Sequence, residues 1–235
     1  MCGRFSLSQS AEAIAEVFAL PEVPNWEPRY NIAPTQLVPT IWRSPEQSDR
    51  QFHLLRWGLI PSWAKDPAMG ARLINARAET VAEKPSFRAA FRHRRCLVVA
   101  DGFFEWQHGL AKDASPAKSP HQQGKKQPFY FRLQNGKPFA FAGLWEHWQA
   151  PDGEVIESCT ILTTVANKLL CPIHDRMPVI LDPKDYDLWL NPAVQQAEPL
   201  QQLLRPYPDA AMTSYAVSTL VNNPANNSLE CINSQ

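Results

Sequence analysis

The first five residues, Met1-Cys2-Gly3-Arg4-Phe5, contain the most reactive group in the chain. Once the initiator methionine is removed, Cys2 carries an α-amine and a thiol on adjacent carbon atoms. Their unperturbed pKa values are about 7.7–8.0 and about 8.5, so a usable fraction of each is deprotonated near neutral pH. The amine can condense with an aldehyde to an imine, and the thiolate can then close a five-membered thiazolidine ring. Cys2 is therefore a candidate nucleophile, against the alternative of an ordinary chain start with a small second residue.

Glu105 is a candidate general acid or base because of its aromatic surroundings in the segment A-D-G-F-F-E-W. The segment follows a continuous apolar run at residues 96–100, which predicts a buried strand. In an extended chain Phe103 and Glu105 share one face, while Phe104 and Trp106 share the other. Desolvation by three aromatic side chains predicts a raised pKa for the carboxyl group, which suits proton transfer. The alternative is an exposed glutamate at the end of a strand.

His174 lies in a stiff polar loop between Pro172 and Pro178, beside Asp175 and Arg176. Histidine titrates near neutral pH, and a neighbouring acid and arginine can bias its protonation. This setting favours a role in proton transfer over that of a structural histidine.

A polar stripe is predicted at N-A-R-A-E-T, because Asn75, Arg77 and Glu79 share one face of an extended segment. An amide, a guanidinium and a carboxylate in a row suit a phosphate-rich ligand, although an edge strand can show the same pattern. The stripe lies within residues 56–100, where nine Lys and Arg accompany three acids in a chain of zero net charge. We expect this basic excess to meet an anionic ligand on one face, or else to form a solvated face with structural ion pairs.

Trp63 ends the motif W-G-L-I-P-S-W, in which tryptophans lie beside prolines in a loop. Such side chains can stack on unpaired nucleobases, but tryptophans more often belong to the core. Both interpretations of Trp63 stay open, a base-stacking platform and a core side chain.

Short strands and helices must position these groups. Ser8 or Ser10 can cap a helix with Ile14, Val17 and Phe18 on one face. Strands are predicted at residues 37–42, 52–60, 96–100, 129–133, 139–144, 155–166 and 212–217, and short helices at residues 85–92, 183–190 and 199–204.

Two connections between these elements have clear signatures. An Asn-Gly pair at residues 135–136 separates the strands at residues 129–133 and 139–144, which strongly predicts a hairpin with a type I′ turn. Residues 107–127 are rich in Lys, Gln, Ser and Pro and predict a mobile hairpin loop. With no internal repeat and no convincing boundary, we expect residues 1–235 to form one domain.

Composition is that of a soluble globular protein, with 44% hydrophobic and 20% charged residues. The five cysteines are odd in number and widely spaced, without a C-x-x-C motif, so we expect neither a zinc site nor a disulfide framework. A leader, a long apolar run and a lipidation signal are not recognisable, which predicts a cytoplasmic protein, or a nuclear one in a eukaryote. We expect no cofactor and no metal ion.

Seven segments follow one another along nearly the whole chain: M-C-G-R-F, R-Y-N-I-A-P, W-G-L-I-P-S-W, I-N-A-R-A-E-T, A-D-G-F-F-E-W, I-H-D-R-M-P and V-S-T-L-V-N. In this order they resemble the SRAP (SOS-response-associated peptidase) family. The clearest departure is the polar insertion after Gln107. The resemblance implies an α+β fold with a strongly curved, barrel-like, mostly antiparallel β-sheet flanked by short helices.

The resemblance also implies covalent capture of abasic sites in single-stranded DNA, through a thiazolidine on Cys2 after removal of Met1. The crosslink, formed by lyase-like imine chemistry, would shield the site in the DNA damage response. The expected partner is single-stranded DNA with abasic sites, as exposed at replication forks. The family name implies an autocatalytic peptidase that removes its own methionine or a short leader. We further expect a monomer that contacts no membrane and joins the nucleoid when bound to DNA.

Carried over by position, the resemblance makes Cys2 the nucleophile and Asn75 the residue that positions the N-terminus and the sugar. Glu105 becomes the acid and base that helps to open the deoxyribose ring, and His174 assists proton transfer and crosslink stability. The positions expected to contact DNA are Arg4, Trp63, Arg77, Trp106, Thr163 and Arg176.

Two other functions are compatible with the opening segment. Class II glutamine amidotransferases also begin with Met-Cys-Gly and use an N-terminal Cys thiolate against an amide, but the downstream segments that clamp glutamine are not recognisable. A non-covalent module for single-stranded or modified DNA, with Cys2 incidental, is the third possibility. Mass spectrometry separates the three, since they give a DNA adduct, glutamine turnover or neither.

Overall fold

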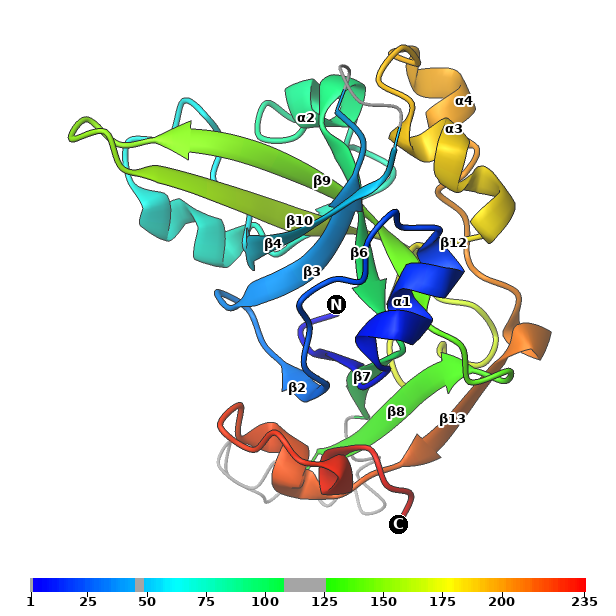
Figure 1. The fold of residues 1–235 in the computed structure, drawn as a ribbon. Coiled ribbons are helices and arrows are strands. Elements are labelled where there is room, and N and C mark those ends of the chain that lie inside the picture. Colours follow the sequence, from blue (N-terminus) through cyan, green and yellow to red (C-terminus); the bar gives the residue numbers. More distant parts are fainter. Residues whose placement is uncertain (1, 45–48, 108–125) are drawn as a thin grey trace, which may run out of the picture.

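The computed structural model describes residues 2–44, 49–107 and 126–235, which form the α+β fold expected from the sequence (Figure 1). Within these ranges the chain forms thirteen β-strands, four α-helices and five short 3₁₀ helices. The predicted mobile loop at residues 107–127 lies mostly outside the described residues. Its two ends, Gln107 and Gln127, pair across antiparallel strands, so the segment connects neighbouring strands.

Five strands close into a barrel. They are β3 (Leu37–Trp42), β4 (Gln51–Trp57), β6 (Arg95–Ala100), β9 (Phe139–Gln149) and β10 (Val155–Val165). Along the path β10–β4–β3–β6–β9 each strand is hydrogen-bonded to the next, and β9 also pairs with β10, which closes the ring. All of these pairings are antiparallel except that of β10 with β4. The barrel-like sheet expected from the sequence is therefore confirmed.

Three short strands extend this sheet. β5 (Asn75–Arg77) runs parallel to β10, β11 (Arg176–Pro178) is antiparallel to β10, and β12 (Ile180–Leu181) is antiparallel to β9. Thr163 of β10 pairs with Arg77 on one side and Pro178 on the other. The end of β10 therefore brings the N-A-R-A-E-T and I-H-D-R-M-P segments to the same part of the molecule.

A second sheet of five antiparallel strands carries the N-terminus and Glu105. Its order is β13 (Met212–Ala216), β8 (Gln127–Leu133), β7 (Gly102–Gln107), β1 (Phe5–Leu7) and β2 (Arg29–Ile32). Phe5 pairs with Phe103, so the first strand lies directly beside the strand that contains Glu105. Figure 1 shows this sheet beneath the barrel, with the N-terminus near the centre of the molecule.

The prediction of a hairpin at residues 135–136 is wrong. Gly136 has a φ of 66°, as a tight turn requires, but the strands on either side belong to different sheets. β8 pairs with β7 and β13, whereas β9 pairs with β6, β10 and β12. A turn signal determines only a local change of direction, and burial against other strands decides the pairing.

Aromatic rings join the two sheets in one core. Phe5 of β1 and Phe103 of β7 contact Phe141 of β9, with ring-centroid distances of 5.9 and 6.0 Å. All three side chains are fully buried. The second sheet is therefore packed against the barrel, and Cys2 belongs to the same core cluster.

Asp101 anchors the first strand to the beginning of β7. Its carboxylate accepts hydrogen bonds from Ser6 Oγ, Ser8 N and Ser8 Oγ, each at 2.6 Å, and from the Tyr130 hydroxyl at 3.5 Å. Asp101 is 5% exposed, so these bonds compensate a buried charge. They hold the N-terminal segment against the strand that carries Glu105.

Short helices flank the sheets. α1 (Ala11–Phe18) begins at Ser10, whose Oγ accepts a hydrogen bond from Ala13 N at 3.3 Å, and it buries Ile14 and Phe18 as the sequence predicts. The others are α2 (Arg88–His93), α3 (Tyr186–Leu190), α4 (Ala197–Gln201) and the 3₁₀ helices Pro67–Arg72, Pro183–Asp185, Asp209–Ala211, Thr219–Asn222 and Leu229–Cys231. None of the helices in the described residues has the length and apolar character needed to traverse a lipid bilayer.

Candidate active site

Cys2 is fully buried and is held by Asn75. The Cys2 carbonyl oxygen accepts a hydrogen bond from Asn75 Nδ2 at 2.7 Å, and the Cys2 Sγ lies 3.9 Å from the carbonyl oxygen of Arg4. Parallel pairing of Asn75 with Ile161 fixes β5 along the barrel. Asn75 Oδ1 is buried and has no hydrogen-bond partner within the described ranges, so one acceptor of this amide is available.

A cavity of about 460 Å³ next to this segment gathers polar side chains from distant parts of the sequence. Its lining consists of Gly3, Arg4, Glu105, Trp106, Lys126, His174 and Asn222. An adjoining space of about 500 Å³ shares three of these side chains and adds Thr219. Four of the site residues predicted from the sequence are among the seven that line the first cavity.

Glu105 is almost completely buried, with 3% of its surface exposed. Burial raises the pKa of its carboxyl group to about 7, and the negative charge of Asp175 adds to the rise. The direction is the one that the aromatic segment predicts. At neutral pH the group is divided between its acid and base forms, which suits proton transfer in both directions.

The Cys2 thiol is less acidic than the sequence alone suggests. Burial raises its pKa above the ordinary value, and the carboxylate of Glu105 raises it further. The buried thiol is therefore protonated at neutral pH, which corrects the usable thiolate fraction expected from unperturbed values. The sequence could not show this, because segments far along the chain enclose the thiol. A base must accept the thiol proton when the sulfur attacks.

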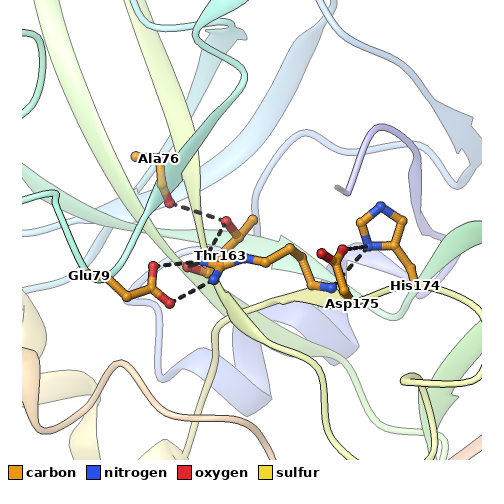
Figure 2. A network of polar contacts seen from close by, with 6 residues as sticks. Ala76, Glu79, Thr163, His174 and Asp175 are labelled. Atoms are coloured by element: carbon orange, nitrogen blue, oxygen red, sulfur yellow. Dashed lines mark hydrogen bonds and ion pairs between the residues drawn. The ribbon is translucent and has the colours of Figure 1, made fainter.

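His174 has two competing partners at one ring nitrogen. The backbone N–H of Arg176 donates to Nδ1 at 2.9 Å, and a carboxylate oxygen of Asp175 lies 3.1 Å from the same atom (Figure 2). Nδ1 accepts from Arg176 when it carries no proton and donates to Asp175 when it carries one. The imidazole is therefore held in place in both protonation states, as a group that moves protons requires.

The guanidinium of Arg176 is engaged within the protein. Nη1 and Nη2 donate to the two carboxylate oxygens of Glu79 at 2.6 and 2.9 Å, and Nη2 also donates to the carbonyl oxygen of Thr163 at 2.6 Å. Figure 2 shows how Thr163 links Ala76 to this ion pair. Thr163 is fully buried, so in this structure it supports Arg176 and offers no contact at the surface.

Arg4 and the C-terminal tail form one wall of the cavity. Arg4 Nη1 donates to Asn31 Oδ1 at 2.7 Å and to the carbonyl oxygen of Val221 at 2.6 Å. Its guanidinium carbon lies 5.8 Å from the centroid of the Trp106 ring. Trp106 Nε1 in turn donates to Asn222 Oδ1 at 2.7 Å. These contacts fix the guanidinium and the indole that the family resemblance assigns to DNA binding.

Sequence reasoning missed Asn31, Lys126 and Asn222. Asn31 is 2% exposed, and its Nδ2 donates to three carbonyl oxygens of the C-terminal tail. Both asparagines lie in segments that were recognised as motifs, but their partners are far away in sequence. Lys126 adjoins the polar insertion and belongs to no motif.

Four of the six predicted DNA contacts lie outside the lining of this cavity: Thr163 and Arg176, described above, and Arg77 and Trp63. Arg77 is exposed on β5, two residues before Glu79. Trp63 is 57% exposed, so it is not a core side chain. It lines a separate cavity of about 660 Å³ together with Lys65, which combines an aromatic face with a positive charge.

Two members of the basic excess at residues 56–100 are bound within the protein, as the second expectation has it. Arg94 forms an ion pair with Glu146 at 2.8 Å. Arg95 is buried and donates five hydrogen bonds to backbone carbonyl oxygens. Part of the excess is therefore structural, and only exposed members such as Arg77 stay available to an anionic ligand.

Metal ligands are not clustered in the described part of the chain. No three His, Cys, Asp or Glu side chains lie there within reach of one metal ion.

The fold and the cavity define an α+β protein with a buried cysteine at its N-terminus, next to a raised-pKa carboxyl group and a histidine. Residues 1–224 match the family described as SOS response associated peptidase (SRAP). The chain belongs to the SRAP family, as its motifs suggested.

Relatives and solved structures agree with this assignment. The abasic site processing protein YoqW of Bacillus subtilis (strain 168) is 45% identical over 237 residues, covering 100% of both chains. The abasic site processing protein HMCES of Xenopus tropicalis is 30% identical over 275 residues, covering 99% of this chain and 78% of its own. A crystal structure of a protein from Bacteroides thetaiotaomicron, 27% identical, matches with a TM-score of 0.84 over 100% of both chains.

Proposed function

We propose that this protein processes abasic sites in single-stranded DNA by forming a thiazolidine crosslink on Cys2. The observation that carries the proposal is the position of Cys2, held by Asn75 beside a cavity that contains Glu105 and His174. The 45% identity to an abasic site processing protein over the whole chain supports the same substrate. Met1 must first be removed, because only then does residue 2 carry a free α-amine.

The first step opens the sugar. An abasic deoxyribose is mostly a closed hemiacetal, so a proton must reach the ring oxygen before the aldehyde is released. Glu105, with a pKa of about 7, can donate this proton and accept one later. The amine of Cys2 then adds to the aldehyde carbon, and loss of water gives the imine. Asn75 holds the Cys2 carbonyl, and its free Oδ1 is available to the amine or to a sugar hydroxyl.

The second step closes the ring. The sulfur of Cys2 adds to the imine carbon, the thiol loses its proton, and the former imine nitrogen gains one, so no further reactant is needed. Because burial keeps the thiol protonated, a base must take that proton. The carboxylate of Glu105 is close enough to raise the pKa of the thiol, and it can serve as this base. Elimination of the 3′ phosphate competes with closure, but a thiol on the same residue as the imine has a high effective concentration. His174 assists these proton transfers and stabilises the closed ring.

Affinity for DNA comes from cations and flat rings at the cavity and on exposed segments outside it. Arg4, Arg77 and Lys126 supply positive charge, and Trp106 and Trp63 offer faces on which bases of any identity can stack. A phosphate group that approached Arg176 would have to displace Glu79, the carboxylate partner of that arginine. We further propose that the protein removes its own Met1 and acts as a cytoplasmic monomer on single strands exposed at replication forks.

The decisive experiment uses a single-stranded oligonucleotide from which one uracil has been excised. Protein that has lost Met1 should give an adduct that survives a denaturing gel. Cys2→Ser should lose this band and give at most an imine that borohydride traps, and protein that retains Met1 should give neither. Mass spectrometry of the adduct, with a parallel assay of glutamine turnover, separates this function from an amidotransferase. A stable adduct formed by Cys2→Ala would refute the assignment.

A further inference from the structure

A second cavity, of about 290 Å³, lies at the end of the barrel remote from Cys2. Its walls include Trp42, Arg43, His53, His93, Arg95 and Trp145. The register places Trp42 opposite Gln51 at one end of the β3–β4 ladder, and Arg95 begins β6 at that same end. The other end of the β3–β4 ladder carries Trp57, whose ring contacts Phe5 of the N-terminal segment at 5.2 Å. The two cavities are therefore separate.

One wall of the second cavity is aromatic. The ring of Trp42 packs edge-on against His53, with centroids 4.4 Å apart, and also packs against Trp145. The three side chains come from β3, β4 and β9, all strands of the closed barrel, so their positions are set by the ladder. A rigid wall of this kind suits a flat ring that packs against it.

The same cavity also carries positive charge, from Arg43 and Arg95. Arg95 donates to the carbonyl oxygens of five residues, and none of its partners in the described ranges is a carboxylate. Arg43 forms an ion pair with Asp187 at 2.8 Å, but Asp187 also pairs with Arg50 at 2.9 Å. One carboxylate thus serves two arginines, and within the described ranges the buried Arg95 meets carbonyl dipoles and the ring of Trp189 but no carboxylate. An anion would be attracted to this place.

Two nitrogen atoms of the lining are buried and lack a hydrogen-bond partner in the described part of the chain, His53 Nε2 and Arg43 Nε. Buried polar groups in folded proteins nearly always have partners, and an unmade bond costs free energy. Burial lowers the pKa of His53, so its ring is neutral at pH 7 and offers one donor and one acceptor. Polar atoms of a bound molecule would satisfy both positions.

We propose that this cavity binds a small, flat aromatic anion, whose ring packs on the Trp42 wall and whose acidic group meets Arg43 and His53. The volume is near the lower limit for ligand pockets, so the ligand is small: one ring system with one acidic group, attached directly or through a sugar. Two sources share this chemistry, a mononucleotide and an aromatic carboxylate. The proposal is independent of the crosslinking function, because the cavity shares no lining residue with the site at Cys2.

The test is a titration of the full-length protein, followed through the indole ¹H–¹⁵N signals of its eight tryptophans. The probes are deoxyadenosine monophosphate and indole-3-carboxylate. We expect saturable shifts of the Trp42 and Trp145 signals with a dissociation constant of about 1 mM or tighter for at least one probe. Arg43→Gln should weaken binding about tenfold, since it removes a charge-assisted bond. Arg132→Gln, the same change at an exposed position of β8 in the second sheet, should leave the affinity unchanged.

Each outcome decides between the possibilities. Binding of one probe alone identifies the source of the ligand as nucleotide or aromatic acid. The proposal is overturned if neither probe shifts these two signals at about 10 mM, or if the shifts centre on Trp106 beside Cys2. Unchanged affinity in a folded Arg43→Gln protein would also overturn it. If that variant does not fold, His53→Phe provides the same comparison, because it keeps a ring and removes Nε2.

Discussion

Replacement of Glu105 by Gln should stabilise the folded protein at alkaline pH. Burial raises the pKa of the Glu105 carboxyl group from 4.5 to about 7, so between these values the folded state keeps a proton that the unfolded chain has released. The free energy of unfolding therefore falls as the pH rises through this window, because the unfolded state binds fewer protons. A shift of this size corresponds to about 3 kcal/mol at pH 8. Gln carries no charge at any pH, so the variant avoids this loss.

The same substitution should slow crosslink formation. Gln keeps the size and hydrogen-bonding capacity of Glu105 but cannot exchange a proton, and the loss of a general acid or base typically costs about a hundredfold or more in rate. Non-covalent affinity for abasic DNA should stay near that of the wild type. In the wild type, the step that uses protonated Glu105 should be fastest below pH 7 and should decline about tenfold per pH unit above it.

Urea unfolding at pH 5 and pH 8 measures the first effect, and adduct yield against time on denaturing gels measures the second. Glu83→Gln is the matched control, because Glu83 is an exposed glutamate and its replacement should change neither quantity. If Glu105→Gln gained no stability at pH 8 relative to pH 5, the argument from burial would be refuted. If Glu105→Gln formed the adduct at the wild-type rate at both pH 6 and pH 8, Glu105 would be excluded as the proton donor.

Three further predictions concern the surroundings of the site. His174→Ala should still react but should give a less durable adduct or more 3′ strand cleavage, resolved by borohydride trapping against time; a wild-type product ratio would remove its role. Arg77→Gln should reduce the slope of log affinity for single strands against log salt concentration by about one unit. Glu79→Gln should increase this slope by about one unit, because it releases Arg176. Unchanged slopes would mean that Arg77 and Arg176 have structural roles only. Asp101→Asn should lower the free energy of unfolding by about 2–3 kcal/mol, because an amide cannot accept all the bonds that the carboxylate accepts; denaturant titration measures the loss.

Local patterns were sufficient for several of the elements, although not for short strands such as β2 and β11. The cap at Ser10, the buried faces of α1 and the strand containing Glu105 all follow from spacing and side-chain type, because these features depend on near neighbours in sequence. The turn at Gly136 was also visible, but its hairpin was not the pairing that formed. Any strand can pair with any other, so the partners of β8 and β9 depend on which arrangement buries the most apolar surface in the whole molecule.

The candidate site divides in the same way. The sequence by itself determined that the chain begins with a residue carrying two potential nucleophiles, that Glu105 lies among aromatics, and that His174 has charged neighbours. Only the tertiary structure decided that the Cys2 thiol is enclosed and therefore holds its proton, that Arg176 is paired with Glu79, and that the C-terminal tail walls the cavity. The reason is physical: spacing fixes which side chains share a face, whereas desolvation and ion pairing depend on atoms that segments far apart in sequence bring together.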